Sequence, residues 1–307
     1  MEKIVIIGSG CAGMSAAIYA ARGGMNPLVL EGGQPGGLIT TTSEVENFPA
    51  FPEGIGGFDL AWKMREQAQK FGARIENGMV EKVDFSSIPK KIFCDGNRTI
   101  EAERVIVATG ASPRMTGAKN EMQLYGGGGV SACATCDGAF YRGRDVVVVG
   151  GGDSACEEAN FLTRFCSSVK LIHRREGFRA SKIMEQRVRE NPKIALVLNS
   201  VVTEVLADED GKCRAVKVKN VKSGAEAEIA CAAMFVAIGH KPNTDVFKGA
   251  LKMDPDGYLL AKEGSLVETD IGGVYVAGDC SDRVFRQAVT AAAMGCMAAI
   301  KASQFEL

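Results

Sequence analysis

Two cysteines stand in a short motif that could do redox chemistry. Cys133 and Cys136 lie in the stretch SACATCDGAFY, residues 131–141, and Asp137 follows directly. A three-residue separation within a helical turn or a tight loop brings two sulfur atoms within disulfide range. A cysteine reacts as its thiolate, so a leaving thiolate needs a proton donor. Asp137 is the adjacent titratable side chain and is predicted to be that donor, with a helix cap as its alternative role.

Metal binding is the other common use of such a cysteine pair. A zinc site needs about four ligands. The chain has one Cys-x-x-Cys motif, and its two histidines, His173 and His240, stand at no ligand spacing. We therefore predict no metal site. The remaining cysteines stand mostly in apolar or alanine-rich contexts and are predicted to be small buried side chains.

An internal repeat indicates the elements that must position this chemistry. Residues 4–13 read IVIIGSGCAG and residues 146–155 read VVVVGGGDSA. Each copy is a β-branched run, a Gly-x-Gly-x-x-Gly or Gly-x-Gly-x-x-Ala turn and an alanine-rich segment, which is the opening of a dinucleotide-binding βαβ unit. In order, the three small residues turn the chain, admit a pyrophosphate at a helix N-terminus and pack the helix on the strand. They are Gly8, Gly10 and Gly13 in the first copy and Gly150, Gly152 and Ala155 in the second.

The two copies differ at the end of their second strand. Glu31 closes PLVLE in the first copy, where a carboxylate can accept hydrogen bonds from a ribose diol. In the second copy the matching place is followed by Arg174, Arg175 and Arg179, and guanidinium groups favour a nucleotide with a 2′-phosphate. The alternative for this stretch, HRREGFRAS, is a solvated basic helix start.

A third landmark is the segment GVYVAGDCSDRVFRQAVTAA, read as a strand ending in Gly278 and Asp279 before a long alanine-rich helix. Asp279 could be an ordinary N-cap. Alternatively its carboxylate reaches a ribityl hydroxyl of a flavin, with the helix N-terminus near the pyrimidine edge of the ring.

Length and local sequence predict two α/β domains. The chain has 307 residues, with 46% hydrophobic and 24% charged residues, as in ordinary globular proteins. VATGASPR (residues 107–114) and IGHKPNT (residues 238–244) read as crossings between domains. They delimit an inserted domain, residues 115–244, within a discontinuous domain of residues 1–114 and 245–307. The β-rich stretches at residues 74–85 and 215–229 are expected to form, in each domain, a small antiparallel layer inserted into the parallel sheet.

Charge and hydropathy exclude some kinds of partner. The net charge is −1 and the pI is near 6.2, whereas a nucleic-acid-binding face is normally basic. The first strand begins near Lys3, which leaves no room for a signal peptide, and no apolar run approaches the ~20 residues of a membrane span. We expect a cytoplasmic protein with no nucleic-acid or membrane partner.

Over nearly its full length the sequence resembles the low-molecular-weight thioredoxin reductases, which are NADPH-dependent flavoproteins. The motifs GSGCAG, TTTSEVENFPAFPEGI, CATCDG, GGGDSACEEA, HRREGFRAS, IGHKPNT and AGDCSDRVFRQAVTAA follow in the family's order. The resemblance implies two Rossmann-like domains of the three-layer ββα type, the second inserted into the first. It also implies FAD in the discontinuous domain, around Gly8, Gly10, Gly13, Glu31, Gly37, Asn47, Gly278, Asp279, Arg286, Gln287 and Ala288. NADPH would bind the inserted domain around Gly150, Gly152, Ser154, Ala155, Arg174, Arg175 and Arg179.

The same resemblance implies an order of catalytic steps and an oligomeric state. Cys136 faces the flavin, Cys133 attacks the disulfide of oxidised thioredoxin, and Asp137 is the acid. The chain would be a homodimer. In the family the inserted domain rotates about its two crossings, which places hinges here at residues 112–116 and 241–245.

Two positions, one on each side of the cysteines, depart from the family pattern. Gly128 stands where the family often has an arginine, and Ala139 where it often has an aromatic residue. The glycine run at residues 126–129 is expected to be unusually flexible. Three other functions remain as alternatives: a peroxiredoxin reductase flavoprotein, a dithiol oxidase, and a non-catalytic sensor that binds both nucleotides.

Overall fold

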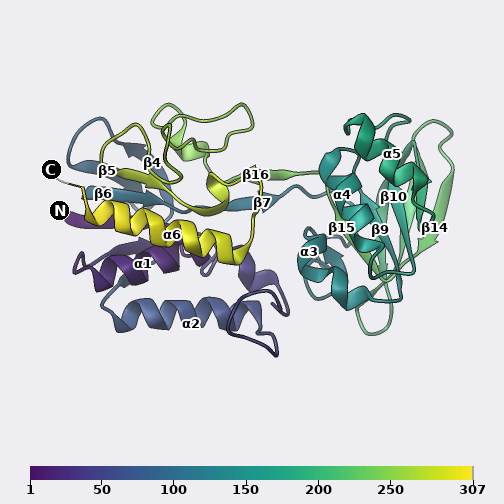
Figure 1. Cartoon of the computed structure of the whole chain (residues 1–307), viewed down its shortest axis with the longest axis horizontal. Coiled ribbons are helices and arrows are strands. Elements are labelled where there is room, and N and C mark those ends of the chain that lie inside the picture. Colours follow the sequence, from purple (N-terminus) through teal and green to yellow (C-terminus); the bar gives the residue numbers. More distant parts are fainter. Residues whose placement is uncertain (306–307) are drawn as a thin grey trace. The chain divides into compact units, whose positions relative to one another are not determined.

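The computed structural model describes residues 1–305 and divides the chain into two compact units. Unit 1 consists of Met1–Ser112 together with the segment that begins at Lys241, and unit 2 is Pro113–His240. Figure 1 shows the two connecting segments. They are β7 (Ala111–Pro113) and β16 (His240–Pro242), which pair with each other as a two-stranded sheet.

Unit 1 is built on a sheet in the order β3-β2-β1-β6-β5-β4, with β17 also paired to β6. Strands β3, β2, β1, β6 and β17 run parallel, and β6, β5 and β4 form an antiparallel meander. The long strand β6 joins the two parts, because its first half pairs with β5 and its second half with β17. The strands are β1 (Glu2–Ile7), β2 (Leu28–Leu30), β3 (Arg74–Glu76), β4 (Val80–Asp84), β5 (Lys90–Cys94), β6 (Arg98–Val107) and β17 (Val274–Val276).

Both faces of the parallel strands of unit 1 are buried. Ile4 and Ile6 of β1 pack under the helices, whereas Val5 and Ile7 face the meander and the segment around Phe247. This arrangement explains the uninterrupted β-branched run, since a parallel sheet covered on both faces needs apolar side chains at every position. The helices of this unit are α1 (Cys11–Arg22), α2 (Gly57–Lys70) and α6 (Ala288–Ser303), with short 3-10 turns η1 (Leu38–Thr41), η3 (Asp245–Phe247) and η4 (Gly278–Cys280).

Unit 2 repeats the plan with a smaller sheet. Its parallel strands lie in the order β11-β10-β9-β15-β8, and a separate antiparallel sheet has the order β12-β13-β14. Helices cover one face of the parallel sheet and the antiparallel sheet covers the other. The strands are β8 (Val130–Ser131), β9 (Asp145–Val149), β10 (Ser168–Ile172), β11 (Ile194–Val197), β12 (Ser200–Ala207), β13 (Cys213–Asn220), β14 (Glu226–Ala230) and β15 (Ala233–Val236). The helical elements are α3 (Ala134–Asp137), η2 (Gly138–Tyr141), α4 (Asp153–Leu162) and α5 (Lys182–Glu190).

The predicted fold class, two Rossmann-like units of three ββα layers, is confirmed by this architecture. Two local expectations were wrong. Arg74–Glu76 does not belong to the antiparallel layer, because β3 extends the parallel sheet beside β2. The antiparallel strands of unit 2 form a sheet of their own instead of continuing the parallel one. Within residues 1–305, no helix is both long enough and apolar enough to cross a bilayer.

Candidate active site

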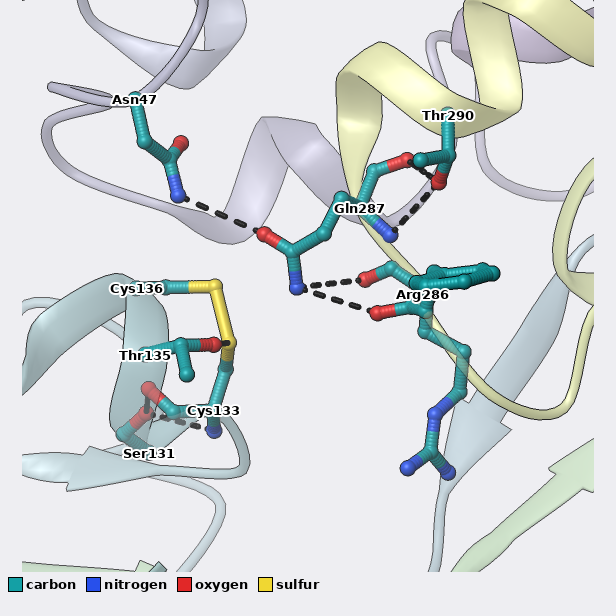
Figure 2. Close-up of a disulfide and its surroundings, with 9 residues drawn as sticks. Asn47, Ser131, Cys133, Thr135, Cys136, Arg286, Gln287 and Thr290 are labelled. Carbon is teal, nitrogen blue, oxygen red and sulfur yellow. Dashed lines mark hydrogen bonds between the residues drawn. A yellow bond between two sulfur atoms is a disulfide. The ribbon is translucent and has the colours of Figure 1, made fainter. Parts of the chain in front are cut away.

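Cys133 and Cys136 form a disulfide at the start of the short helix α3 (Figure 2). Cys133 is the N-cap of α3, and its carbonyl oxygen accepts hydrogen bonds from the backbone N–H groups of Cys136 and Asp137, at 3.2 and 3.1 Å. This single turn holds the two Cα atoms 5.3 Å apart, within the range for a disulfide. Both side chains are only partly buried, so a reaction partner can reach the sulfur atoms.

Two hydroxyl groups beside the disulfide were missed by the sequence analysis. The Oγ of Ser131, a buried residue of β8, accepts a hydrogen bond from the Cys133 backbone N–H at 3.0 Å. The Oγ1 of Thr135 lies 3.3 Å from the Sγ of Cys133. Figure 2 shows both contacts. A hydroxyl this close to a sulfur atom can donate a hydrogen bond to its thiolate, and such a bond favours the charged form.

Asp137 ends α3, and its carboxyl group lies in a partly buried setting. Burial raises the pKa of Asp137 above the usual aspartate value, and a hydrogen bond with Ser131 opposes that rise. The alternative role as a helix cap is not supported, because Asp137 stands at the N-cap position of η2 without making a side-chain capping bond. A carboxyl group that keeps its proton to higher pH than an exposed aspartate is suited to protonating a leaving thiolate.

The first glycine loop is tightly packed at its first and third glycines and open at its second. Gly8 has φ +110°, and a Cβ there would lie 2.3 Å from the Ala108 carbonyl oxygen. A Cβ on Gly13 would lie 1.9 Å from the Gly8 carbonyl oxygen, so helix α1 packs directly on the turn. At Gly10, by contrast, the nearest atom to such a Cβ is 3.9 Å away. Gly10 is the N-cap of α1 and carries no side-chain capping bond.

A second loop packs against the first. The Gly36 backbone N–H donates to the Ser9 Oγ at 2.9 Å, and a Cβ on Gly37 would lie 2.8 Å from the Gly10 Cα. The structure thus brings Gly37 next to Gly10. Both Gly36 and Gly37 have positive φ, where glycine is favoured.

Glu31 lies just past β2, which ends at Leu30 instead of at Glu31. Its carboxylate forms a salt bridge with the Nη1 of Arg65 from α2, and the Glu31 side chain is only 9% exposed. The sequence analysis missed Arg65 because this partner comes from a distant helix. The salt bridge fixes the carboxylate next to the first glycine loop, on a recess that Ser9 and Gly36 also line.

The segment before α6 gathers several of the predicted residues of unit 1 (Figure 2). The Asn47 Nδ2 donates to the Gln287 Oε1 at 3.4 Å, which joins parts of the chain far apart in sequence. Gln287 is the N-cap of α6, and its backbone N–H donates to the Thr290 Oγ1 at 3.3 Å. Arg286 has φ +48°, so the chain turns sharply before the helix begins at Ala288.

Asp279 lies in η4, three residues past the end of β17 and well before α6. The prediction that the strand ends in Gly278 and Asp279 was therefore wrong, since β17 ends at Val276. The N-cap alternative is also wrong, because Ala277 occupies the N-cap of η4 and Gln287 that of α6. Burial, aided by the nearby Asp282, raises the pKa of Asp279 to about 6, while Arg286 lowers it. Gly278 has φ +75°, and a Cβ there would lie 2.9 Å from the Cβ of Ala12 in α1.

The second glycine loop follows the same plan with a looser third position. Gly152 is the N-cap of α4 without a side-chain capping bond, and a Cβ on it would meet nothing within 4 Å. Ser154 is exposed in the first turn of α4. Ala155 packs 2.6 Å from where a Cβ on Gly150 would stand. A glycine is required at position 150 by this close approach. Gly150 does not have a positive φ, whereas Gly8 does.

The predicted arginines lie in the loop between β10 and α5. Arg174, Arg175 and Arg179 are all exposed, and none of them forms a salt bridge within residues 1–305. The Arg179 backbone N–H donates to the Gly151 carbonyl oxygen at 2.8 Å, which brings this loop to the glycine turn. The alternative of a basic helix start is wrong, because α5 begins at Lys182, after all three.

Comparisons with known proteins decide the family. Residues 2–295 match the family model described as pyridine nucleotide-disulphide oxidoreductase. Thioredoxin reductase 2 of Arabidopsis thaliana is 48% identical, covering 99% of this chain and 82% of that protein. Thioredoxin reductase of Rickettsia bellii is 48% identical over 99% of this chain and 97% of its own length. A solved thioredoxin reductase from Giardia duodenalis superposes with a TM-score of 0.92 at 40% identity, covering 98% and 97% of the two chains. The chain belongs to the thioredoxin reductases of this family.

As a member of this family, this thioredoxin reductase is a flavoprotein oxidoreductase that uses FAD and NADPH. Unit 1 contains a feature that fits a bound flavin nucleotide. The buried Oγ1 of Thr109 has no hydrogen-bond partner among the described residues, and the Thr109 Cα is 3.2 Å from where a Cβ on Gly8 would stand. A buried hydroxyl without a partner is costly unless a ligand satisfies it. The N-terminus of α1, which has no side-chain cap, likewise offers N–H groups that suit a pyrophosphate.

The second unit of this thioredoxin reductase fits a phosphorylated nicotinamide nucleotide. The open space at Gly152 and the uncapped N-terminus of α4 suit a pyrophosphate. The adjacent arginine loop carries positive charge that no acidic partner neutralises within residues 1–305. Such a loop can bind a 2′-phosphate bidentately.

Proposed function

We propose that this thioredoxin reductase reduces the disulfide of oxidised thioredoxin with electrons from NADPH, and so maintains thiol redox balance. The observation that carries the proposal is the Cys133–Cys136 disulfide, partly exposed and followed by a carboxyl group with a raised pKa. Relatives that share nearly half of their residues with this chain carry the name thioredoxin reductase. When bound, FAD and NADPH supply the electron pair that a disulfide reduction consumes.

We further propose that the two nucleotides divide between the two domains. Residues 1–114 and 245–307 would hold FAD through Gly8, Gly10, Gly13, Glu31, Gly37, Asn47, Gly278, Asp279, Arg286, Gln287 and Ala288. Residues 115–244 would hold NADPH through Gly150, Gly152, Ser154, Ala155, Arg174, Arg175 and Arg179. The two uncapped helix N-termini at Gly10 and Gly152 support this division, as do the acidic group in one unit and the cationic loop in the other.

The cysteines and Asp137 perform the thiol chemistry. Two electrons and two protons convert the Cys133–Cys136 disulfide to a dithiol. The Cys133 thiolate then attacks one sulfur of the thioredoxin disulfide, and the Asp137 carboxyl protonates the thiolate that leaves. Cys136 attacks the mixed disulfide, which reforms the internal disulfide and releases reduced thioredoxin. The hydroxyls of Ser131 and Thr135 hold Cys133 in place for this exchange.

We also propose that the enzyme is a cytoplasmic homodimer. All eight cysteines outside the motif are free thiols, seven of them buried. Unpaired thiols fit a reducing compartment. The family resemblance supports the dimer, and sedimentation of the purified protein tests it directly.

The experiment that tests the proposed function is NADPH oxidation by the purified flavoprotein, with and without oxidised thioredoxin from the same organism. We expect fast turnover that requires thioredoxin and is lost in Cys136→Ser, which removes the resolving sulfur. Oxidation of NADPH that thioredoxin does not stimulate would contradict the proposal. In that case small disulfides, peroxiredoxins and oxygen would be tried as acceptors.

A further inference from the structure

A second pair of cysteines lies in contact inside unit 2, apart from the active-site disulfide. Cys213 begins β13, and Cys231 directly follows β14. Their Sγ atoms are 3.9 Å apart, and the two residues are 2% and 5% exposed. The sequence analysis interpreted both as isolated buried side chains, because eighteen positions separate them in the chain. The antiparallel pairing of β13 with β14 makes them neighbours, and the Cys231 backbone N–H donates to the Arg214 carbonyl oxygen at 3.1 Å.

The two thiols are chemically unequal. The pKa of Cys213 is lowered mainly by a hydrogen bond from Cys231. Burial acts in the opposite direction. The same hydrogen bond and burial raise the pKa of Cys231. Since the thiolate is the nucleophile, the lowered pKa favours Cys213 as the sulfur that attacks an oxidant, and the 3.9 Å separation places Cys231 to react with the product.

Cys213 also supports the segment that leads to the active site. Its backbone N–H donates to the Gly128 carbonyl oxygen at 2.8 Å. Gly129 has φ +103°, and a Cβ there would lie 2.7 Å from the Cys213 Cβ, so the glycine is needed for this close approach. The prediction that the glycine run is unusually flexible is therefore not supported, because Gly128 and Gly129 pack against Cys213. From Gly129 the chain enters β8, whose Ser131 holds the backbone of Cys133.

We propose that Cys213 and Cys231 are a second redox pair, which hydrogen peroxide oxidises to a disulfide that slows thioredoxin reduction. The Cys213 thiolate attacks the peroxide, the O–O bond breaks, and hydroxide leaves to give a sulfenic acid on Cys213. The Cys231 sulfur then attacks the Cys213 sulfur and displaces the hydroxyl group, which leaves as water with the Cys231 proton. In total, two thiols and one peroxide give one disulfide and two waters.

Formation of the Cys213–Cys231 disulfide affects the active site because the two sulfur atoms must move closer together. A disulfide bond is about 2.05 Å long, so the sulfurs move together from their 3.9 Å separation. Cys213 cannot move without disturbing Gly128 and Gly129, which it contacts. The displacement passes along β8 to Ser131 and hence to Cys133. This inference goes beyond the proposed function, since the pair takes no part in turnover.

Peptide mapping tests whether the bond forms. The holoprotein with its Cys133–Cys136 disulfide intact is treated with hydrogen peroxide, unfolded, alkylated and digested with trypsin. Cleavage after Lys212 and Arg214 releases Cys213 in a dipeptide, and Cys231 is the sole cysteine in the peptide of residues 223–248. We expect these two peptides to be linked, with a mass two hydrogens below their sum. Recovery of both cysteines as alkylated thiols, at a dose that oxidises other thiols of the protein, would overturn the proposal.

Activity measurements test the consequence. After peroxide treatment we expect thioredoxin reduction by the wild type to fall roughly threefold or more, with recovery after dithiothreitol. Cys231→Ala removes the resolving sulfur. After peroxide treatment, this variant should therefore show little of the activity loss that dithiothreitol can reverse. Cys166→Ala, which removes a buried thiol from the other layer of unit 2, should behave like the wild type. Equal inhibition of wild type and Cys231→Ala, or a linked peptide without inhibition, would overturn the regulatory role.

Discussion

The two glycine loops share one backbone plan but differ in how closely the following helix packs. In unit 1 a Cβ at the third position, Gly13, would lie 1.9 Å from the Gly8 carbonyl oxygen, whereas unit 2 accommodates the methyl group of Ala155 there. Helix α1 is also confined from its other side, because a Cβ on Gly295 of α6 would lie 2.0 Å from the Ala12 carbonyl oxygen. The two copies of the motif therefore tolerate a larger side chain to different degrees, depending on what packs behind the helix.

The charges beside the loops differ as well. Glu31 beside the first loop is largely buried and paired with Arg65, whereas the arginines beside the second are exposed. Unit 1 presents an acidic group held by a salt bridge, and unit 2 presents exposed cationic side chains.

Gly13→Ala should abolish FAD retention, since no rearrangement short of moving α1 relieves a contact of 1.9 Å with backbone. The reciprocal change, Ala155→Gly, should cost only about 1 kcal/mol of stability and leave turnover nearly normal. Absorbance of the bound flavin and thermal unfolding measure both. Normal flavin content in Gly13→Ala would show that the two loops are equally tolerant.

Asp137→Asn should lower thioredoxin reduction by about a hundredfold, the usual contribution of a general acid. Burial raises the pKa of Asp137, so the carboxyl donates a proton below this raised pKa and loses that ability above it. In the wild type, kcat/KM for thioredoxin should therefore fall as the pH rises through this value. The pH profile of the variant should lack that decline, and a decline that persists would assign it to another group.

Replacing Arg174 and Arg175 with alanine should raise the KM for NADPH roughly tenfold to a hundredfold, because charge-assisted bonds to the 2′-phosphate are lost. The KM for NADH, which lacks that phosphate, should change less than about twofold. Lys219→Ala removes an exposed cation elsewhere in unit 2 and serves as the control. Equal weakening of both nucleotides would show that these arginines do not read the phosphate.

Glu31→Gln should have the smallest effect, a loss of about 1 kcal/mol in FAD affinity, since one charge-assisted bond becomes a neutral one. Arg65→Ala is the matched variant, because it keeps the carboxylate and removes its partner. We expect it to weaken FAD by a similar amount, measured by flavin release during dialysis. Tighter FAD binding in Arg65→Ala would show that the arginine competes with the nucleotide for Glu31.

The sequence alone predicted those parts of the site that local spacing encodes. The glycine turns, the cysteine pair and the arginine loop each lie within about ten consecutive residues, and the structure places the small residues of both turns where a helix meets a strand. What the sequence did not reveal depends on contacts between distant segments. Arg65 reaches Glu31 from another helix, and Cys213 meets Cys231 only because β13 and β14 pair. The unpartnered hydroxyl of Thr109 is visible only once burial and hydrogen bonds are known.

The discontinuity of unit 1 has a consequence for biosynthesis. Unit 2 is one continuous stretch, Pro113–His240, so it can fold as soon as it leaves the ribosome. Unit 1 cannot, because β17 pairs with β6 and α6 packs on α1, and both are made after unit 2. During synthesis, one side of α1 therefore stays uncovered beside the first glycine loop, whereas the domain that contains the second glycine loop is already complete. The nascent chain is therefore most exposed to aggregation on the face of α1 that α6 later covers.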